Sequence, residues 1–415
     1  MTDLLSIQEA QEKIISVIAK REPEFCDVQE AYGRVLAENI QSPLNLPPFH
    51  NSSMDGFAVQ SKYTLTASPS NPVRLAVKMD IPAGFYQAET LPDGTAARIL
   101  TGAPLPAGAD AVVQIENTDL QGASQTTALP DFVSIFAPVK PGENVRLAGE
   151  DVKSGQQVLQ TGRILQPQDI GLLVSLGIQR VLVARQPVIA LFSSGDELLT
   201  PDQPLTPGKI YDANGYVLTG LLEKAGARVI QLGIARDNPQ SVVETLDKAL
   251  PDKPDLIISS AGVSVGVFDF VRQVIEENGT INFWRVNIRP GKPVAFGNYK
   301  DIPFLGLPGN PVSAYIGCLI FAYPVIRHLL GLVPSMLKTV KAILSQPVVS
   351  PDGRESFYRG VLTIENGIYK AALTGHQGSG NLFSLVQANA LLIVPAGVMS
   401  IPAGAEISAV PLEDE

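Results

Sequence analysis

The chain has 415 residues, which is more than one hydrophobic core of ordinary size organises, so two to four domains are expected. A net charge of −10 and a pI near 5.0 argue against a surface for nucleic acid or anionic membranes. The two cysteines, Cys26 and Cys318, fit neither a disulfide framework nor a metal-binding spacing.

The chain begins with segments that have a helical pattern. No basic stretch followed by an apolar one precedes them, so the sequence shows no signal peptide. Residues 7–20 place apolar side chains on one helical stripe, and residues 27–40 repeat the pattern, with Asp27 as the expected cap of the second helix. We interpret both segments as helices of a scaffold.

A β-rich segment then interrupts the scaffold. Residues 42–59 are predicted to form a loop, because prolines break any helix, and this loop carries Asp55 within a polar cluster. Short alternating apolar runs between residues 73 and 139 are separated by Pro-Ala-Gly and Pro-Asp-Gly turns, which indicates short strands. Thr101 directly follows one of them, either as a turn residue or as a hydroxyl presented at a strand end.

From Pro187 onward, apolar strands alternate with helical segments. This alternation indicates βαβ units and a mostly parallel, doubly wound sheet, in which ligands bind beyond the carboxyl ends of the strands. The expected elements are strand 188–192, helix 214–225, strand 228–234, helix 239–250, strand 255–260, helix 268–278, strands 280–286, 293–297 and 302–306, and a helix from Asn310-Pro311.

The most apolar run, residues 316–333, is interrupted by Pro324 and Arg327. It is therefore predicted to be a buried helix and not a membrane span. Together with the charge and the cysteines, this predicts a cytoplasmic protein with no nucleic-acid or membrane partner. In the last part of the chain, residues 361–372 alternate around Asn366-Gly367, which is a strong hairpin signal in a small β domain.

The expected fold class is thus multidomain, with α/β and β parts. The domains are a discontinuous scaffold of helices and strands in residues 1–45 and 141–186, an inserted β-rich domain in residues 46–140, a doubly wound α/β domain in residues 187–334, and a small β domain in residues 335–415.

Acidic side chains follow the predicted parallel strands. Asp196, Glu197, Asp237 and Asp269 lie in or just beyond the strand-to-helix turns. Taken one by one, each is more often a turn or cap residue. Gathered at one edge of a sheet they would repel one another, which favours a bound divalent cation, and oxygen ligands suit Mg²⁺.

Basic side chains gather in the same domain. Arg285, Arg289 and Lys292 surround a rigid Pro-Gly turn in an otherwise acidic sequence. The alternative is a solvated strand edge, but the neighbouring glycine turns, with free amides, favour a pocket for an oxyanion. Carboxylates, cations and amides together predict a metal-assisted reaction on a small molecule that carries phosphate.

One motif points to a different chemistry. Residues 262–266, Gly-Val-Ser-Val-Gly, match the nucleophile elbow of serine hydrolases and lie between a strand and a helix. A hydrolase would also need an acid and a histidine downstream, for which His376 is the one good candidate, and an HGGG-type oxyanion loop, which the sequence lacks. A serine hydrolase is therefore the weaker hypothesis.

Over nearly its whole length the chain resembles the molybdopterin molybdenumtransferase family, which includes MoeA and the E domain of gephyrin. Eight ordered motifs carry the resemblance. They are Pro47-Pro-Phe-His-Asn-Ser-Ser-Met-Asp-Gly-Phe-Ala-Val59, Thr101-Gly-Ala-Pro104, Gly149-Glu-Asp151, Ser194-Gly-Asp-Glu-Leu198, Gly262-Val-Ser-Val-Gly266 with Asp269, Arg289-Pro-Gly-Lys-Pro293, Leu307-Pro-Gly-Asn-Pro-Val-Ser313 and Gly375-His-Gln-Gly-Ser-Gly380.

The resemblance implies that adenylated molybdopterin and molybdate give molybdenum cofactor and AMP, with Mg²⁺. It also implies a homodimer of four-domain subunits, in which residues 187–334 form the molybdopterin-binding domain. The active cleft then lies between this domain and the inserted domain of the partner subunit. Molybdopterin adenylyltransferase and molybdoenzyme apoproteins are the other expected partners.

The motifs also carry residue roles over to this chain. Asp237 and Asp269, with Glu197 nearby, are expected to hold Mg²⁺ and pyrophosphate. Asp55 and Thr101 are expected to reach in from the partner subunit. The residues expected at the nucleotide and phosphate are Gly262, Ser264, Gly266 and Asn310, and those expected at molybdate are Arg285, Arg289, Lys292, Pro293, Arg359 and Ser379.

The sequence departs from the family where many members have lysine and this chain has Arg285 and Arg289, so a forked donor replaces a point charge. Two rival functions stay open. Molybdopterin adenylyltransferases share the α/β module but show a Gly-Gly-Thr-Gly loop at the position of residues 261–266. A non-enzymatic cofactor carrier or gephyrin-like scaffold is disfavoured by the intact candidate metal ligands.

Overall fold

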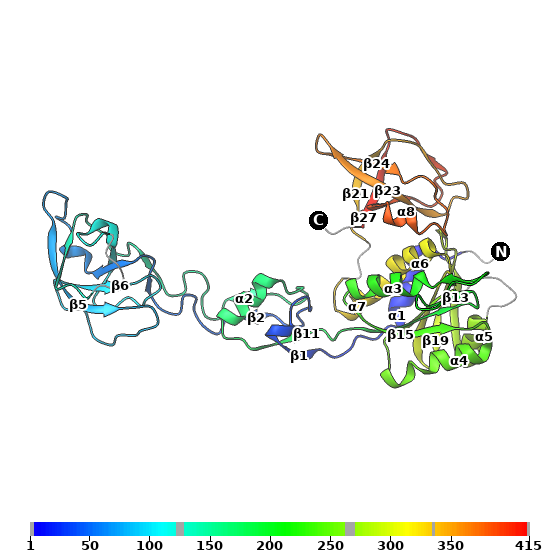
Figure 1. Ribbon diagram of the computed structural model, residues 1–415, viewed down its shortest axis with the longest axis horizontal. Coiled ribbons are helices and arrows are strands. Elements are labelled where there is room, and N and C mark those ends of the chain that lie inside the picture. The colour runs from blue at the N-terminus through cyan, green and yellow to red at the C-terminus, as the bar shows by residue number, and fades with distance from the viewer. Residues whose placement is uncertain (1–3, 122–127, 262–269, 334–336, 413–415) are drawn as a thin grey trace. The chain divides into compact units, whose positions relative to one another are not determined.

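The computed structural model describes residues 4–121, 128–261, 270–333 and 337–412 (Figure 1). The chain divides into two compact units. The larger unit consists of Met1–Ala37 with Val181–Glu415, and the smaller unit is Glu38–Arg180. This division does not separate the four domains expected from the sequence, so their boundaries stay a prediction.

A six-stranded sheet organises the first part of the larger unit. Three of its four parallel strands have apolar, buried centres, whereas the fourth, at one edge, is partly exposed. Two antiparallel strands extend the sheet at the other edge. The mostly parallel sheet expected from the sequence is therefore confirmed. In spatial order the strands are β15 (Arg228–Ala235), β12 (Val188–Ser194), β16 (Leu256–Ser260), β20 (Ile302–Leu307), β19 (Pro293–Tyr299) and β17 (Gly279–Arg285).

Helices cover both faces of this sheet (Figure 1). Alternate residues of β12 enter different cores, because successive side chains of a strand point to opposite faces. Ile189 and Leu191 pack in the core with α1, α3, α6 and α7, whereas Ala190 and Phe192 pack in the core with α4 and α5. The helices are α1 (Ile7–Val17), α3 (Ala213–Lys224), α4 (Pro239–Asp247), α5 (Phe270–Asn278), α6 (Pro311–Gly317), a π-helical turn (Cys318–Ala322) and α7 (Tyr323–Leu329).

Among the described residues, one helical segment is long and apolar enough to cross a membrane. This segment is Pro311–Leu329, and 78% of its apolar window is buried inside the chain. It lies in the core beside the sheet, where Val312, Ile316 and Val325 are fully buried. The segment is thus a core helix, as its interrupting Pro and Arg residues predicted.

The prediction of a helix in residues 27–40 is wrong. Only a short 3₁₀ turn forms there, Val28–Glu30, preceded by β1 (Glu24–Asp27). Gly33 has a φ of +75°, which a right-handed helix does not accommodate, and Ala37 N–H bonds instead to the carbonyl of Leu182 in β11 (Arg180–Val183). The apolar spacing reflects contacts with that strand and not a helical face.

The C-terminal part of the larger unit is a small closed barrel. Pairing of β23 with β25 closes a ring of five strands, so these strands leave no open sheet edge. The predicted hairpin is confirmed, with Asn366 and Gly367 at φ values of 51° and 77° between its strands. The elements are β21 (Val340–Leu344), β22 (Val348–Val349), β23 (Glu355–Glu365), β24 (Ile368–Leu373), α8 (Phe383–Val386), β25 (Ala390–Val394), β26 (Ser400–Ile401) and β27 (Glu406–Pro411).

One short strand joins the α/β part to the barrel. Strand β18 (Ile288–Arg289) pairs in parallel with β23, so that Ile288 faces Glu355 and Arg289 faces Ser356. The backbone of Arg289 is thereby fixed against the barrel. A side chain that the sequence assigns to the α/β domain thus lies next to the C-terminal barrel.

The smaller unit contains a five-stranded sheet whose order is β7-β4-β6-β5-β8. The predicted strands are present, but β4 (Gly56–Val59) forms where a loop was expected, so that part of the prediction is wrong. All four β4 residues are buried, which a pattern of alternation cannot reveal. The other elements are β2 (Ile40–Gln41), β3 (Asn51–Ser52), a 3₁₀ turn (Ser61–Tyr63), β5 (Val73–Ile81), β6 (Thr95–Ile99), β7 (Ala111–Gln114), a 3₁₀ turn (Ile115–Asn117), β8 (Phe132–Ile135), β9 (Val145–Arg146), β10 (Gln157–Leu159) and α2 (Pro167–Ser175).

Asp169, in the first turn of α2, completes a capping box with the N-cap residue Gln166 and is 4% exposed. Burial acts to raise its pKa, but hydrogen bonds from the Arg163 guanidinium and from Gln166 N–H outweigh burial and hold the pKa below its ordinary value. A carboxyl with a depressed pKa stabilises the folded state above its unfolded pKa, and this contribution is lost as the pH falls through the folded pKa.

Asp169→Asn is therefore expected to lower the free energy of unfolding by about 1–2 kcal/mol at neutral pH. The difference from the wild type should be smaller at about pH 3 than at neutral pH, because the contribution is lost progressively as the pH falls from the unfolded pKa of about 3.9 toward the lower folded pKa. Urea unfolding followed by circular dichroism at both pH values measures this effect. The control is Asp131→Asn, a substitution at an exposed position in the same unit. A penalty for Asp169→Asn that persists unchanged at the lower pH would contradict the assignment.

Candidate active site

Two adjoining cavities lie in the larger unit, at the carboxyl ends of the parallel strands. The first has a volume of about 560 Å³ and follows β12 and β16, where Ser194, Glu197 and Ser260 line it. The second, called the arginine cavity, has a volume of about 350 Å³ and contains Arg289, Arg354, Arg359 and Ser379. The residues that line both cavities are Pro293, Pro308 and Asn310.

Glu197 brings a carboxylate to the first cavity. Its side chain folds over Gly195, so closely that a Cβ added to Gly195 would lie 2.5 Å from Glu197 Oε2. Glycine at position 195 is thus what allows the carboxylate to take this position. Strand β12 places both residues at its carboxyl end, where a ligand of a parallel sheet is expected.

Asp196 and Asp237 connect two neighbouring turns. Asp237 Oδ2 accepts from Asp196 N–H at 3.2 Å, and Asp196 Oδ1 accepts from Asp237 N–H at 3.3 Å. Asp237 Oδ1 also accepts from the hydroxyl of Ser194, at 3.4 Å, and Ser194 lines the first cavity. The carboxylate of Asp237 therefore lies just behind the cavity wall and is not among the residues that line it.

Four predicted residues lie outside the described residues: Gly262, Ser264, Gly266 and Asp269. That the carboxylates of Asp237 and Asp269 lie close together therefore stays a prediction. In the part of the chain that the structure describes, no group of three His, Cys, Asp or Glu residues gathers to hold a metal ion. The predicted Mg²⁺ site of Glu197, Asp237 and Asp269 therefore stays a prediction, because Asp269 lies outside the described residues.

Arg359 is the most distinctive residue of the arginine cavity. It is 1% exposed, and its guanidinium donates to Ser384 Oγ and to the carbonyl of Gly378, both at 3.0 Å. No carboxylate pairs with it among the described residues. Burial lowers its pKa to about 10, so the guanidinium stays charged at neutral pH. A buried cation without a counterion is costly, and an anion bound in the cavity would offset that cost.

The C-terminal barrel is attached to the α/β part around this cavity. Val312 N–H, in the first turn of α6, donates to the carbonyl of Ser379 at 3.0 Å. Gln377 accepts from Arg359 N–H and donates to Arg359 carbonyl oxygen, at 2.9 and 3.0 Å, which fixes the barrel loop over β23. The predicted Arg289, Pro293, Arg359 and Ser379 are thus brought together in one cavity.

Arg285 and Lys292 are exposed, and neither is among the described residues that line the two cavities. Arg285 pairs with Pro293 in the β17–β19 ladder, and Lys292 adjoins Pro293 in sequence. Both therefore lie near the predicted oxyanion pocket without forming its wall. Their predicted roles at molybdate stay predictions.

Comparisons with known proteins agree along the whole chain. Three family models match it: "MoeA N-terminal region (domain I and II)" over residues 5–177, "Probable molybdopterin binding domain" over residues 190–328, and "MoeA C-terminal region (domain IV)" over residues 341–412. The molybdopterin molybdenumtransferase of Nostoc sp. is 38% identical over 98% of this chain and 93% of its own length. The chain belongs to the MoeA family.

Other members of the MoeA family support this assignment. The molybdopterin molybdenumtransferase of Haemophilus influenzae is 37% identical over 98% of both chains. A crystal structure of the molybdopterin biosynthesis MoeA protein from Pyrococcus horikoshii matches with a TM-score of 0.82 and 31% identity, covering 100% of both chains. The multidomain α/β fold with mixed sheets is thus the fold of the MoeA family.

The two site residues predicted in the smaller unit lie together. Thr101 donates through both its backbone N–H and its hydroxyl to Asp55 Oδ1, each at 2.7 Å. Asp55 directly precedes β4, and Thr101 lies just beyond β6. The structure thus joins two MoeA motifs that are far apart in sequence. Their approach to a cavity of another subunit stays a prediction.

Sequence reasoning missed Asn214 in the first cavity. Its side-chain amide donates to Ser260 Oγ and to the carbonyl of Gly309, both at 2.7 Å. It therefore connects the start of α3, the end of β16 and the turn before α6. Asp212 caps α3 by accepting from Gly215 N–H, but no local pattern reveals that Asn214 bonds to residues so distant in the MoeA sequence.

Proposed function

We infer that the chain is a molybdopterin molybdenumtransferase, an enzyme of molybdenum cofactor biosynthesis that inserts molybdate into molybdopterin. The family and the full-length relatives named molybdopterin molybdenumtransferase support this conclusion. The structural observation that carries it is Arg359, a buried, charged side chain without a carboxylate partner among the described residues, in a cavity that adjoins a larger one. The transferase is favoured over adenylyltransferase, carrier and serine hydrolase.

The two cavities suit the two substrates. Molybdate is a tetrahedral dianion, and the arginine cavity offers the forked donors that oxyanions require. The first cavity is larger and carries hydroxyl, amide and carboxylate groups, which suit an adenylated molybdopterin. Because Pro293, Pro308 and Asn310 line both, the reacting ends of the two substrates would meet at these residues.

Release of AMP needs stabilisation of the negative charge on the phosphate. Glu197 and Asp237 supply carboxylates at the first cavity and just behind its wall, and Asp269 is proposed as their partner from its motif. These residues would hold Mg²⁺, which supplies electrostatic stabilisation of the phosphate oxygens when it is bound. Asn214 keeps the surrounding turns in place, and Arg359 and Arg289 orient the oxyanion.

A homodimer would allow Asp55 and Thr101 of one subunit to complete the cleft of the other. Molybdopterin adenylyltransferase is the proposed source of the adenylated substrate, and molybdoenzyme apoproteins are the proposed acceptors. A cytoplasmic location is supported by Cys26 and Cys318, which are both buried and unpaired.

The experiment that tests this function supplies adenylated molybdopterin, molybdate and Mg²⁺ to the purified chain. Release of AMP is measured by chromatography, and the product is tested by reconstitution of a molybdenum-free apoenzyme. The proposed function requires AMP release that depends on both molybdate and Mg²⁺, together with an active reconstituted enzyme. AMP release without a functional cofactor would indicate simple hydrolysis and would reject the transferase.

Gly195→Ala is expected to displace the Glu197 carboxylate, because the new Cβ would lie 2.5 Å from its Oε2. The rate of AMP release should fall by on the order of tenfold to a hundredfold, as expected for a misplaced group at a reacting centre. Gly220→Ala is the matched control, since a Cβ there meets nothing within 4 Å. Equal rates for both variants would show that the position of Glu197 does not matter for the reaction.

A further inference from the structure

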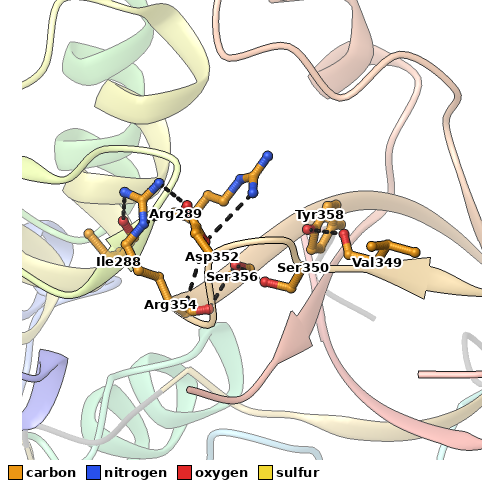
Figure 2. A network of polar contacts seen from close by, with 8 residues as sticks. All are labelled: Ile288, Arg289, Val349, Ser350, Asp352, Arg354, Ser356 and Tyr358. Atoms are coloured by element: carbon orange, nitrogen blue, oxygen red, sulfur yellow. Dashed lines mark hydrogen bonds and ion pairs between the residues drawn. The ribbon is translucent and has the colours of Figure 1, made fainter. Parts of the chain in front are cut away.

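Asp352 contacts two arginines of the arginine cavity, although it is not itself among the residues that line that cavity. Asp352, in the turn before β23, lies between Arg289 and Arg354, as Figure 2 shows. A negative charge beside an oxyanion pocket opposes binding of the very ligand that the pocket is built for. Asp352 belongs to none of the motifs that predicted the site, so its presence there needs its own explanation.

The two arginines are held by Asp352 to different degrees. Arg354 donates two hydrogen bonds to Asp352 Oδ2, from Nε at 2.9 Å and from Nη2, and a third from Nη1 to the carbonyl of Ile288 at 3.0 Å. Arg289 Nη1, in contrast, lies 3.6 Å from Asp352 Oδ1, which is too long for a hydrogen bond. Arg354 is thus locked in place, whereas Arg289 forms only a loose ion pair.

The charge of Asp352 persists at neutral pH. Hydrogen bonds from Arg354 are the largest cause that holds its pKa below the ordinary value, and Arg289 acts in the same direction. The turn that carries Asp352 is also well supported. Ser356 Oγ donates to the carbonyl of Arg354, and Tyr358 donates to the carbonyl of Val349 at 2.7 Å (Figure 2). Asp352 is therefore a fixed anion facing a less constrained cation.

The backbone of Arg289 is fixed while its guanidinium is not. Pairing of β18 with β23 holds the main chain of Arg289 opposite Ser356. The side chain is 35% exposed, and among the described residues its one ion pair is the loose contact with Asp352. A bound oxyanion that offers two oxygens to the guanidinium fork would compete well against a contact of 3.6 Å.

We propose that Asp352 is a competing counterion in the oxyanion site. In the empty cavity it pairs with Arg289. When molybdate binds, Arg289 turns to the oxyanion, and the nearby negative charge of Asp352 weakens its retention. Asp352 thereby sets the affinity of the site for the dianion while it locks Arg354 in place. This inference rests on the proposed function, in which the arginine cavity receives molybdate.

The test measures molybdate binding to the full chain by equilibrium dialysis with elemental analysis of molybdenum. Asp352→Asn keeps an oxygen that can accept from Arg354 but removes the charge. It is expected to bind molybdate about fivefold to tenfold more tightly than the wild type, since a charge at short range near a protein surface is worth roughly this factor. Asp352→Ser removes the same charge with a smaller side chain and should bind more tightly as well.

Asp252→Asn is the matched control. It removes one negative charge from another long ion pair, 3.9 Å from Arg228. This pair lines neither cavity, so the change should leave molybdate affinity unchanged. A gain in affinity cannot come from a damaged fold, so it identifies competition. If the wild type binds molybdate and Asp352→Asn binds it no more tightly, the inference about Asp352 is overturned, whereas the oxyanion site still stands. No binding by any of these proteins would overturn the oxyanion site and the inference together.

Discussion

Replacing Arg359 with Met is expected to weaken molybdate binding by about a hundredfold or more, because charge-assisted hydrogen bonds from a buried fork are among the strongest polar contacts in proteins. The side chain is 1% exposed, and no carboxylate pairs with it among the described residues. Its charge is thus available to a ligand in the cavity. Equilibrium dialysis of molybdate against the full chain measures the loss.

Stability should change in the opposite direction to binding. A buried charge without a counterion costs folding free energy, so Arg359→Met should keep or raise the melting temperature of the empty protein. Arg359→Lys tests the geometry, since it keeps a charge but loses the fork, and its affinity should lie between those of the wild type and the Met variant. Arg228→Met, at an exposed pair outside both cavities, is the control. Wild-type affinity in a folded Arg359→Met would remove Arg359 from the oxyanion site.

Glu197→Gln is expected to slow AMP release by about a hundredfold or more while the protein still binds adenylated molybdopterin. The carboxylate lines the first cavity, and loss of its charge would weaken the proposed Mg²⁺ site, which would stabilise the phosphate oxygens when the ion is bound. Excess Mg²⁺ should restore part of the rate, which a merely structural defect would not allow. Rates are measured by single-turnover AMP release over a range of Mg²⁺ concentrations.

The control for Glu197→Gln is Glu223→Gln, a substitution at an exposed position of α3. It removes the same charge from the surface of the same unit and does not line the first cavity. Near-normal AMP release by Glu197→Gln would exclude Glu197 from the reaction. Asp269→Asn is expected to act in the same manner, retaining adenylated molybdopterin and losing most of its hydrolysis.

The sequence predicted the α/β part well because its signals are local. Buried parallel strands appear as continuous apolar runs, and β12 and β16 follow the runs that begin at residues 188 and 255. Turn chemistry located the hairpin at Asn366-Gly367 in the same way. The errors arose where tertiary contacts replace local preference. Strand β4 is buried on both faces and has no alternation, and residues 27–40 bond to a distant strand instead of forming a helix.

The site was predictable only in part for the same reason. The acidic turns and the basic segment at Arg289 could be read from the sequence, and the family resemblance added Arg359 and Ser379. The roles of Asn214 and Asp352 depend on bonds between residues far apart in the chain, such as that of Asn214 with Gly309. Asp352 in particular precedes a glycine and reads as an ordinary turn residue. Only the fold places it between two arginines.

The proposed function requires an oxyanion to bind in the arginine cavity, beside the larger cavity proposed for the pterin nucleotide. The most direct measurement is a crystal structure of the protein soaked in tungstate, a heavy tetrahedral dianion with strong anomalous scattering. One dominant anomalous peak is expected within hydrogen-bond distance of Arg359, Arg289 and Ser379. A peak elsewhere, with none between these three residues, would show that the oxyanion does not bind in the arginine cavity.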